Sequence, residues 1–152
     1  MNPTPQSALA GIRVLDLSRV LAGPWATQIL GDFGADIIKI EKPGDGDDTR
    51  SWGPPFLRKD DGAHGDAAYY LAANRNKRSV TIDFAHPDGA ELVRRLAPHC
   101  QILVENFKVG GLKKYGLDYE SIAAINPSIV YCSVTGFGQT GPLAQQPGFG
   151  AI

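Results

Sequence analysis

The chain has 152 residues, of which 43% are hydrophobic and 20% charged, and its 15 basic and 16 acidic side chains leave a net charge of −1. This composition is typical of a globular domain, and it disfavours nucleic-acid binding, because proteins of that class carry a clear excess of positive charge. No apolar run approaches the roughly 20 residues that cross a bilayer, and the first residues lack the features of a signal peptide, so we expect a cytoplasmic protein without a membrane partner.

The first part of the chain predicts a strand, a helix and a second strand. Residues 12–17 are mostly apolar and indicate a strand. Pro24 suits the first turn of a helix, whose apolar residues at positions 25, 26, 29, 30 and 33 lie on one face. Gly34 supplies a left-handed stop, and residues 36–41 form the next strand. Such a unit implies parallel strands joined by a right-handed crossover.

The remainder of the chain alternates strands and helices after one long irregular segment. Residues 42–76 are rich in Gly, Pro and Asp, so we expect a functional loop there, with a helical turn or two only at 67–73. The predicted strands are 79–84, 101–107 and 128–134, and the predicted helices are 87–99 and 118–125. The alternation predicts an α/β fold, Rossmann-like, with a mainly parallel sheet and flanking helices.

Four loops follow the carboxyl ends of the predicted strands, where open parallel sheets bind ligands. They are 18–23, 42–50, 106–114 and 135–150. The first leads into a helix and could bind phosphate or carboxylate, but it lacks the GxGxxG pattern of nicotinamide or flavin enzymes. A literal GxGxxG stands at 136–141; because prolines follow it, we interpret it as a glycine-rich turn.

Several charged residues allow two interpretations. Asp45, Asp47 and Asp48 could bind a divalent cation, although such a loop more often forms a solvent-exposed turn. Glu41 could bind a ribose or simply be solvated at a strand end. The cations of 74–78 could clamp a nucleotide or form a solvated edge. We expect surface histidines, reduced and buried cysteines, and no metal site.

A set of short motifs, taken in order, resembles one known family. The motifs are GIRVLD (11–16), AGP (22–24), LGDFGADIIKIE (30–41), GDDTR (46–50), NRNKRS (74–79), LVENF (103–107), YGL (115–117), NP (126–127) and SVTGFG (133–138). In this order they resemble the class III CoA-transferase family, the group that includes formyl-CoA transferase, carnitine CoA-transferase and α-methylacyl-CoA racemase.

The resemblance implies an enzyme that transfers coenzyme A between carboxylic acids, from an acyl-CoA donor to a free acid. It implies two interlocked chains in a homodimer, and no cofactor beyond CoA, which is a substrate. Residues 1–10 would be a flexible N-terminus, and 11–152 the N-terminal part of a Rossmann-like large domain, truncated at its C-terminal end. The family's nucleophilic aspartate lies beyond residue 152, so we name no catalytic residue. Asp16, on a strand, should be structural.

The resemblance also implies which residues bind CoA. They are Leu21, Ala22, Lys42, Ile82, Asp83, Phe84, Ala85, Asn106, Phe107, Lys108 and Lys114. Lys42, Lys108 and Lys114 would meet the phosphates as point charges, and the ring of Phe107 could pack on adenine.

Some positions depart from the family pattern. Phe149 stands where the racemases have a catalytic histidine, and because Phe cannot move protons, racemisation is disfavoured. Gly150 replaces a frequent acidic residue, and Val109 replaces a frequent proline. Residues 47–50 and 52–56 resemble branches that act on dicarboxylates such as succinate or glutarate.

Three alternatives remain open at this point. One is an α-methylacyl-CoA racemase-like enzyme, the next is a catalytically inactive CoA-binding fragment, and the last is a nucleotide-dependent oxidoreductase.

Overall fold

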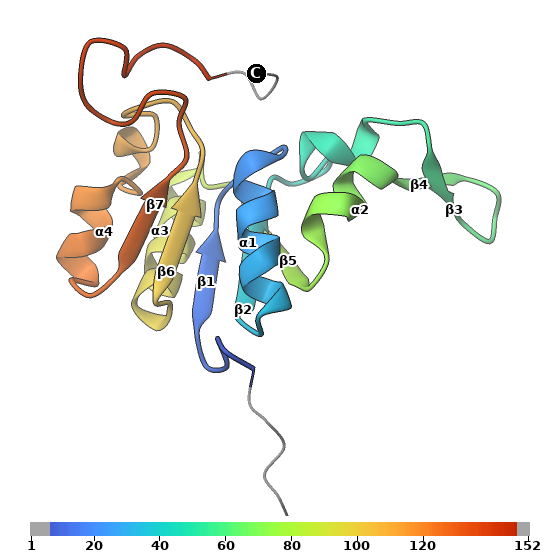
Figure 1. Cartoon of the computed structure of the whole chain (residues 1–152), viewed down its shortest axis with the longest axis horizontal. Helices are drawn as coiled ribbons and strands as arrows, with labels where there is room; N and C mark the ends of the chain where they lie inside the picture. The colour runs from blue at the N-terminus through green and yellow to red at the C-terminus, as the bar shows by residue number, and fades with distance from the viewer. Residues whose placement is uncertain (1–6, 149–152) are drawn as a thin grey trace, which may run out of the picture.

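A computed structural model describes residues 7–148. Five parallel strands form the main sheet (Figure 1): β1 (Arg13–Asp16), β2 (Asp36–Glu41), β5 (Lys77–Thr81), β6 (Ile102–Glu105) and β7 (Val130–Ser133). Their order in the sheet is β5-β2-β1-β6-β7. The order reverses beside β1, so the loops after β1 and β6 leave the sheet next to each other, as at the ligand-binding crevice of open α/β sheets.

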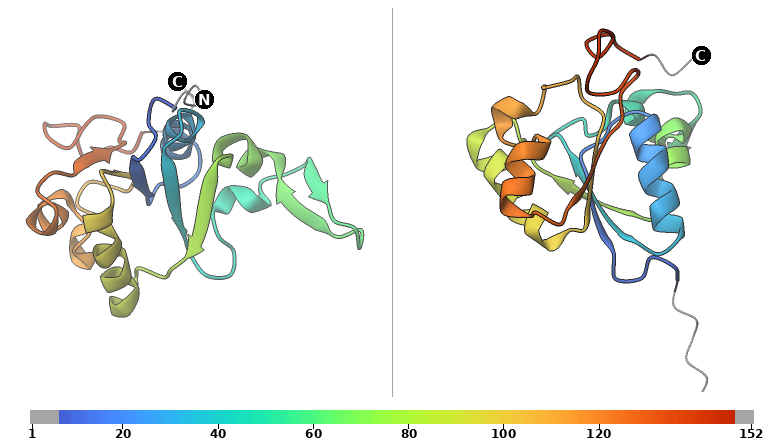
Figure 2. Two further views of the ribbon diagram at one scale, coloured as in Figure 1. Left: turned by 90° about the horizontal axis from the view of Figure 1, so that it is seen from below. Right: turned by 60° about the vertical axis from the view of Figure 1, so that its left-hand side comes forward.

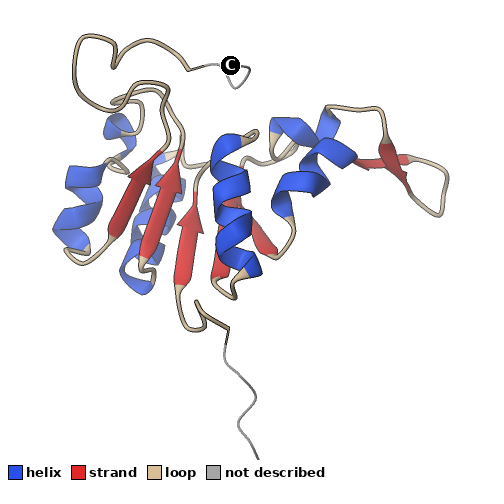
Figure 3. Cartoon of the chain, in the orientation of Figure 1, coloured by secondary structure: helices blue, strands red, loops and turns tan. Residues whose placement is uncertain are grey.

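Helices flank both faces of the sheet (Figures 2 and 3). α1 (Ala22–Asp32) covers one face and contacts α2 (Ala68–Asn74), whereas α3 (Pro87–Leu96) and α4 (Tyr119–Ile125) cover the other. Short 3-10 helices span Asp48–Ser51 (η1), Ala97–His99 (η2) and Lys113–Tyr115 (η3). The predicted α/β class with a parallel sheet and flanking helices is therefore confirmed. None of the helices in the described part of the chain is long and apolar enough to cross a membrane.

The segment from 42 to 76 contains structure that the sequence did not predict. β3 (Phe56–Arg58) and β4 (His64–Ala67) form an antiparallel hairpin that projects from the side of the domain (Figure 1). Gly62, with φ of +81°, lies in the connecting turn, where a left-handed conformation favours glycine. The strands have only three and four residues, so no alternating pattern marks them.

The strand predicted at 79–84 is displaced, because β5 begins two residues earlier and ends at Thr81. Arg78 forms an ion pair with Asp36 at the start of β2, and the buried Lys77 side chain reaches Asp16. Arg75 pairs with Asp32 on α1. The predicted cationic cluster before the strand is thus divided among three acidic partners, and it does not form a clamp for an anionic ligand.

The main hydrophobic core lies between the sheet and the α3–α4 layer. It includes Leu15, Leu17, Ile38, Ile40, Val93, Leu103, Leu117 and Ile122. On the α1 side, a smaller cluster contains Val14, Ala35, Ile37 and Val104.

α1 packs on the sheet through small and polar residues, not through its apolar stripe. Gly31 is buried, and a Cβ there would lie 3.2 Å from Ile37 Cγ1, so the helix approaches the sheet closely. Trp25, Ile29 and Phe33 face away from the sheet, with 54%, 45% and 55% of their surface exposed. The periodicity correctly predicted a helix, but this apolar face is left uncovered by the described residues.

Candidate functional site

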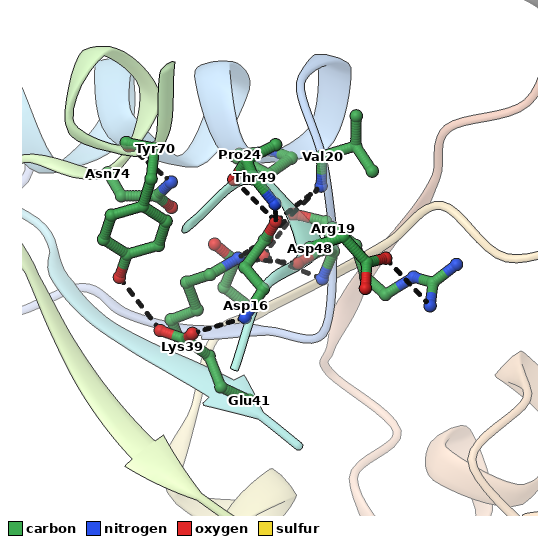
Figure 4. A network of polar contacts seen from close by, with 12 residues as sticks. Asp16, Arg19, Val20, Pro24, Lys39, Glu41, Asp48, Thr49, Tyr70 and Asn74 are labelled. Atoms are coloured by element: carbon green, nitrogen blue, oxygen red, sulfur yellow. Dashed lines mark hydrogen bonds and ion pairs between the residues drawn. The ribbon is translucent and has the colours of Figure 1, made fainter. Parts of the chain in front are cut away.

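The turn between β1 and α1 is held in place by side chains from other segments (Figure 4). The side chain of Asn106 accepts a hydrogen bond from Arg19 N (2.8 Å) and donates one to Arg19 O (2.7 Å). Lys39 Nζ donates to Ser18 O (2.8 Å), and Val20 N donates to Asp47 Oδ2 (3.2 Å). The loops after β1, β2 and β6 are therefore joined at the carboxyl edge of the sheet.

The same turn leads into a helix terminus that is available to a ligand. Val20 has φ of +68°, a left-handed conformation that is unusual for a β-branched residue. No side chain caps α1 at Leu21, although the first N–H groups of a helix need partners. An uncapped amino terminus favours a negatively charged or carbonyl oxygen. Leu21 and Ala22, both predicted to bind CoA, lie at this terminus.

Asp16 is part of the scaffold below the turn, as its strand position predicted. It is fully buried and accepts hydrogen bonds from the hydroxyl groups of Ser18 and Thr27. Lys77 Nζ lies 3.2 Å from Asp16 Oδ2. Burial lowers the pKa of Lys77 to about 8, and the nearby Asp16 charge opposes that shift. Asp16 thus has internal partners and is not presented to a substrate.

Glu41 is also occupied internally, which excludes it as a ribose-binding acid in this conformation. Its two oxygens accept hydrogen bonds from Arg50 (2.7 Å from both Nε and a terminal nitrogen), Tyr70 Oη (2.9 Å), Ser79 Oγ (2.7 Å) and Asp47 N (2.7 Å). Burial alone would raise the pKa of Glu41, but these donors outweigh it and lower the pKa to about 2. The alternative of a solvated strand-end charge is wrong as well, because the residue is only 5% exposed.

The acidic loop after β2 divides into exposed and buried carboxylates. Asp45 is largely exposed, as predicted for a turn, whereas the side chain of Asp47 is only 1% exposed and pairs with Lys39 at 2.9 Å. The prediction of a solvent-exposed turn is therefore wrong for Asp47. Among residues 7–148, no group of three or more His, Cys, Asp or Glu side chains is arranged to hold a metal ion.

The histidines are all exposed, as predicted. The two cysteines differ: Cys100 is buried, but Cys132, on the edge strand β7, is exposed, so the prediction of two buried thiols is wrong for the second.

An aromatic cluster borders the turn and contains two of the predicted CoA-binding residues. The ring of Phe107 lies edge-on to Phe84, with centroids 5.7 Å apart, and Phe84 lies edge-on to Tyr115 at 5.6 Å. Cations lie at both ends of the cluster, with the Arg19 guanidinium 5.4 Å from the Phe107 centroid and Lys114 Nζ 4.7 Å from that of Tyr115. Adjacent aromatic faces and cations suit a phosphorylated nucleotide.

Two of the lysines predicted to bind phosphate, Lys42 and Lys108, each border a pocket. Lys42 forms exposed ion pairs with Asp48 (3.1 Å) and Asp45 (3.6 Å), and the hydrogen bond that Lys42 donates to Asp48 raises the pKa of Lys42. It borders a pocket of about 720 Å³ next to the ends of β2 and β5. Lys108 borders a second pocket, of about 630 Å³, between the loop after β6 and the end of β7.

The predicted CoA-binding residues are thus distributed along one edge of the sheet. Asn106 directly contacts the β1–α1 turn, and Phe107 contacts Phe84. Ile82 belongs to the core, and the Asp83 side chain accepts a hydrogen bond from Ala85 N. Lys42 directly follows β2, whereas Lys114 lies in η3, after β6. The two lysines therefore belong to connections that follow different strands.

Arg19 and Tyr115 were not predicted as site residues, although both belong to this surface. Arg19 lies within the ligand-binding loop predicted at 18–23, which was the one available signal. The positions discussed for racemisation, Phe149 and Gly150, lie outside the described residues.

Comparisons with known proteins agree with one another. The family model described as CoA-transferase family III matches residues 9–152. The chain is 57% identical over 150 residues to a succinate–glutarate CoA-transferase of Agrobacterium fabrum, covering 99% of this chain and 38% of that protein. It is 50% identical over 144 residues to the succinyl-CoA:glutarate CoA-transferase of Homo sapiens, covering 95% and 32%.

The crystal structure of a CAIB/BAIF family protein from Brucella suis has the same fold. The TM-score is 0.89 and the identity 56%, over 95% of this chain and 38% of that one. The chain therefore spans between 32% and 38% of the length of these relatives.

Proposed function

The chain belongs to CoA-transferase family III, and we propose that the protein of which it forms a part transfers coenzyme A between carboxylic acids. In this reaction an acyl-CoA and a free acid exchange the thiol group, so that the thioester of the donor is broken and one to the acceptor is formed. The observation that carries the proposal is the family match over residues 9–152, to which the exposed cations and aromatic rings at the carboxyl edge add physical support.

We propose dicarboxylic acids as donor and acceptor. The relatives named above are described as succinate–glutarate and succinyl-CoA:glutarate CoA-transferases, and the 47–50 and 52–56 motifs pointed to the same branch.

The chain itself would supply much of the CoA-binding site. Lys42, Lys108 and Lys114 are exposed and would pair with the phosphates, and Phe107 would stack on adenine. The ion pairs of Lys42 with Asp45 and Asp48 are exposed surface pairs, which contribute little to stability, so a phosphate can replace them. The N–H groups at the start of α1 would bind an oxygen atom of the ligand.

Because the chain covers so little of its relatives, a catalytically inactive CoA-binding fragment is the second candidate. Both candidates require CoA binding, and turnover of succinyl-CoA with glutarate by the isolated chain separates them. Turnover by this chain would refute the inactive fragment, whereas binding without turnover would support it.

We also propose a cytoplasmic homodimer for the whole protein. Trp25 and Ile29 on α1 and Phe33 at its C-cap form a stripe that the described residues leave uncovered. This stripe supports a subunit contact, because neighbouring exposed apolar side chains are typical of interaction surfaces.

Calorimetric titration with CoA and with dephospho-CoA tests the proposed site. Lys42→Ala or Lys114→Ala should weaken CoA more than dephospho-CoA where the lysine meets the 3′-phosphate, and equal losses would reject that role. Lys59→Ala is the control, since Lys59 is exposed in the β3–β4 turn, away from the site. No heat at millimolar CoA would remove the site altogether.

A further inference from the structure

The β1–α1 turn has a conformation that its own sequence does not favour. Val20 adopts φ of +68°, and a β-branched residue rarely occupies that region without outside restraint. The restraint comes from Asp47, eight residues beyond Lys39 in the chain, whose carboxylate accepts the Val20 N–H at 3.2 Å. Its other hydrogen bonds, from Thr49 N (3.0 Å) and Thr49 Oγ1 (2.7 Å), fix the carboxylate itself. Asp47 therefore connects a rigid 3-10 helix to the strained turn.

The counter-ion of Asp47 acts on the same turn. Lys39 Nζ lies 2.9 Å from Asp47 Oδ2 and 2.8 Å from Ser18 O, and both charged side chains are only 1% exposed. A buried ion pair contributes little net stability, since well-packed apolar residues often replace it without loss. The specific contribution of this pair is the backbone conformation that its hydrogen bonds select.

The restrained turn is followed directly by the uncapped start of α1. We propose that Asp47, with Lys39 as its counter-ion, is a positioning residue of the CoA site: it holds the turn so that the N–H groups of Leu21 and Ala22 face an oxygen atom of bound CoA or acyl-CoA. The inference rests on the proposed function. It assigns Asp47 a role different from the metal ligand or solvated turn residue that the sequence allowed.

The test separates positioning from stability. In the double variant Lys39→Met/Asp47→Leu, both buried charges are removed together, so neither is left uncompensated. Val20, Thr49 and Ser18 lose hydrogen-bond partners, so the free energy of unfolding should fall, and CoA affinity is measured where urea unfolding shows that the variant is folded. That affinity should fall about tenfold or more, because an unrestrained turn occupies its rare conformation only a fraction of the time. Lys39→Met/Asp47→Asn also removes both charges but retains one acceptor oxygen for Thr49, and it provides a second variant if the first does not fold.

The matched control is Ile122→Val. Ile122 is fully buried on α4, and it contacts neither the turn nor the buried ion pair, so this change should lower stability and leave the CoA dissociation constant unchanged. Calorimetry gives the affinity, and urea unfolding gives the stability.

Three outcomes are possible. Either double variant, folded and with weakened CoA binding, supports the positioning role. Wild-type affinity in a folded variant overturns that role and leaves the proposed function intact. A wild-type chain that does not bind CoA refutes the proposed site and the inference with it.

Discussion

Replacement of Glu41 by glutamine should remove the most heavily bonded carboxylate described in this domain. All the groups that contact its side chain through hydrogen bonds are donors, namely those of Arg50, Tyr70, Ser79 and the backbone of Asp47. A glutamine amide would replace one of the two acceptor oxygens by an N–H donor, and Arg50 would lose its ion pair with residue 41 while keeping Asp66 and Tyr70 Oη as partners. Such unpaired polar groups are costly when they are buried.

The size of the effect follows from the pKa. Lowering the pKa of Glu41 from 4.5 to about 2 corresponds to about 3 kcal/mol of stability at neutral pH. Because the folded-state value is the lower one, this contribution is present above pH 4.5 and is lost as the pH falls toward 2. The gap in unfolding free energy between wild type and Glu41→Gln should therefore shrink by roughly 1 kcal/mol between pH 7 and pH 3.5.

Urea unfolding followed by circular dichroism at the two pH values measures this gap. Glu91→Gln is the matched control, since Glu91 forms an exposed ion pair with Arg94 and should cost less than about 1 kcal/mol. A Glu41 variant as stable as the control at pH 7, or a gap that does not change with pH, would refute the reasoning.

Three further changes test other parts of the structure. Burial raises the pKa of the Cys100 thiol to about 11, so at pH 8 a thiol reagent should label one cysteine rapidly, and Cys132→Ser should abolish that phase; two rapid phases would contradict the burial of Cys100. Gly23→Ala should lower the unfolding free energy by about 1–3 kcal/mol, because the new Cβ would overlap the Ser18 side chain; an unchanged thermal midpoint would exclude this close packing. Trp25→Ser should weaken any concentration-dependent self-association in sedimentation velocity with little loss of stability, since Trp25 is 54% exposed, and unaltered association would remove α1 from the proposed interface.

Much of the fold could be predicted, because the local sequence patterns of its strands and helices agree with where those elements lie in the folded domain. The apolar runs of β1 and β2 are buried in the middle of a parallel sheet, which is the environment that produces such runs. α3 begins at Pro87, with Asp88 in its first turn and arginines in its last, so the capping and dipole signals were sufficient.

Two features of the fold were not predictable from local sequence patterns. α1 is amphipathic, but its apolar stripe faces outward, because close packing on the sheet selects small residues such as Gly31 for the buried face. The periodicity of apolar residues shows that a helix has an apolar face, but it does not show which segment or subunit packs against that face. The β3–β4 hairpin was missed because its stability depends on contacts with η1 and α2, which local propensity does not encode.

The sequence could predict which loops form the site, but not which side chains form hydrogen bonds and ion pairs within it. Strand order alone brings the loops after β1 and β6 together, and the structure places Asn106 against the turn at Arg19. By contrast, nothing in the sequence around Asp47 distinguishes it from Asp45 or Asp48. Asp47 differs from them because the fold buries it beside Lys39, where the two side chains form an ion pair.

The charges at the carboxyl edge therefore fall into two classes with different consequences. Lys39 and Asp47 are desolvated, and the removal of one partner leaves the other uncompensated, so single changes there act on the fold before they act on binding. Lys42 is exposed, and its surface ion pairs contribute little to stability, so it can exchange a carboxylate for a phosphate without disturbing the backbone. The two classes can act together at a site for an anionic ligand: the exposed cations attract the ligand, and the buried, internally neutralised pair keeps the turn in place. If charge reversal at Lys42 changes stability as much as affinity, this division of roles is wrong.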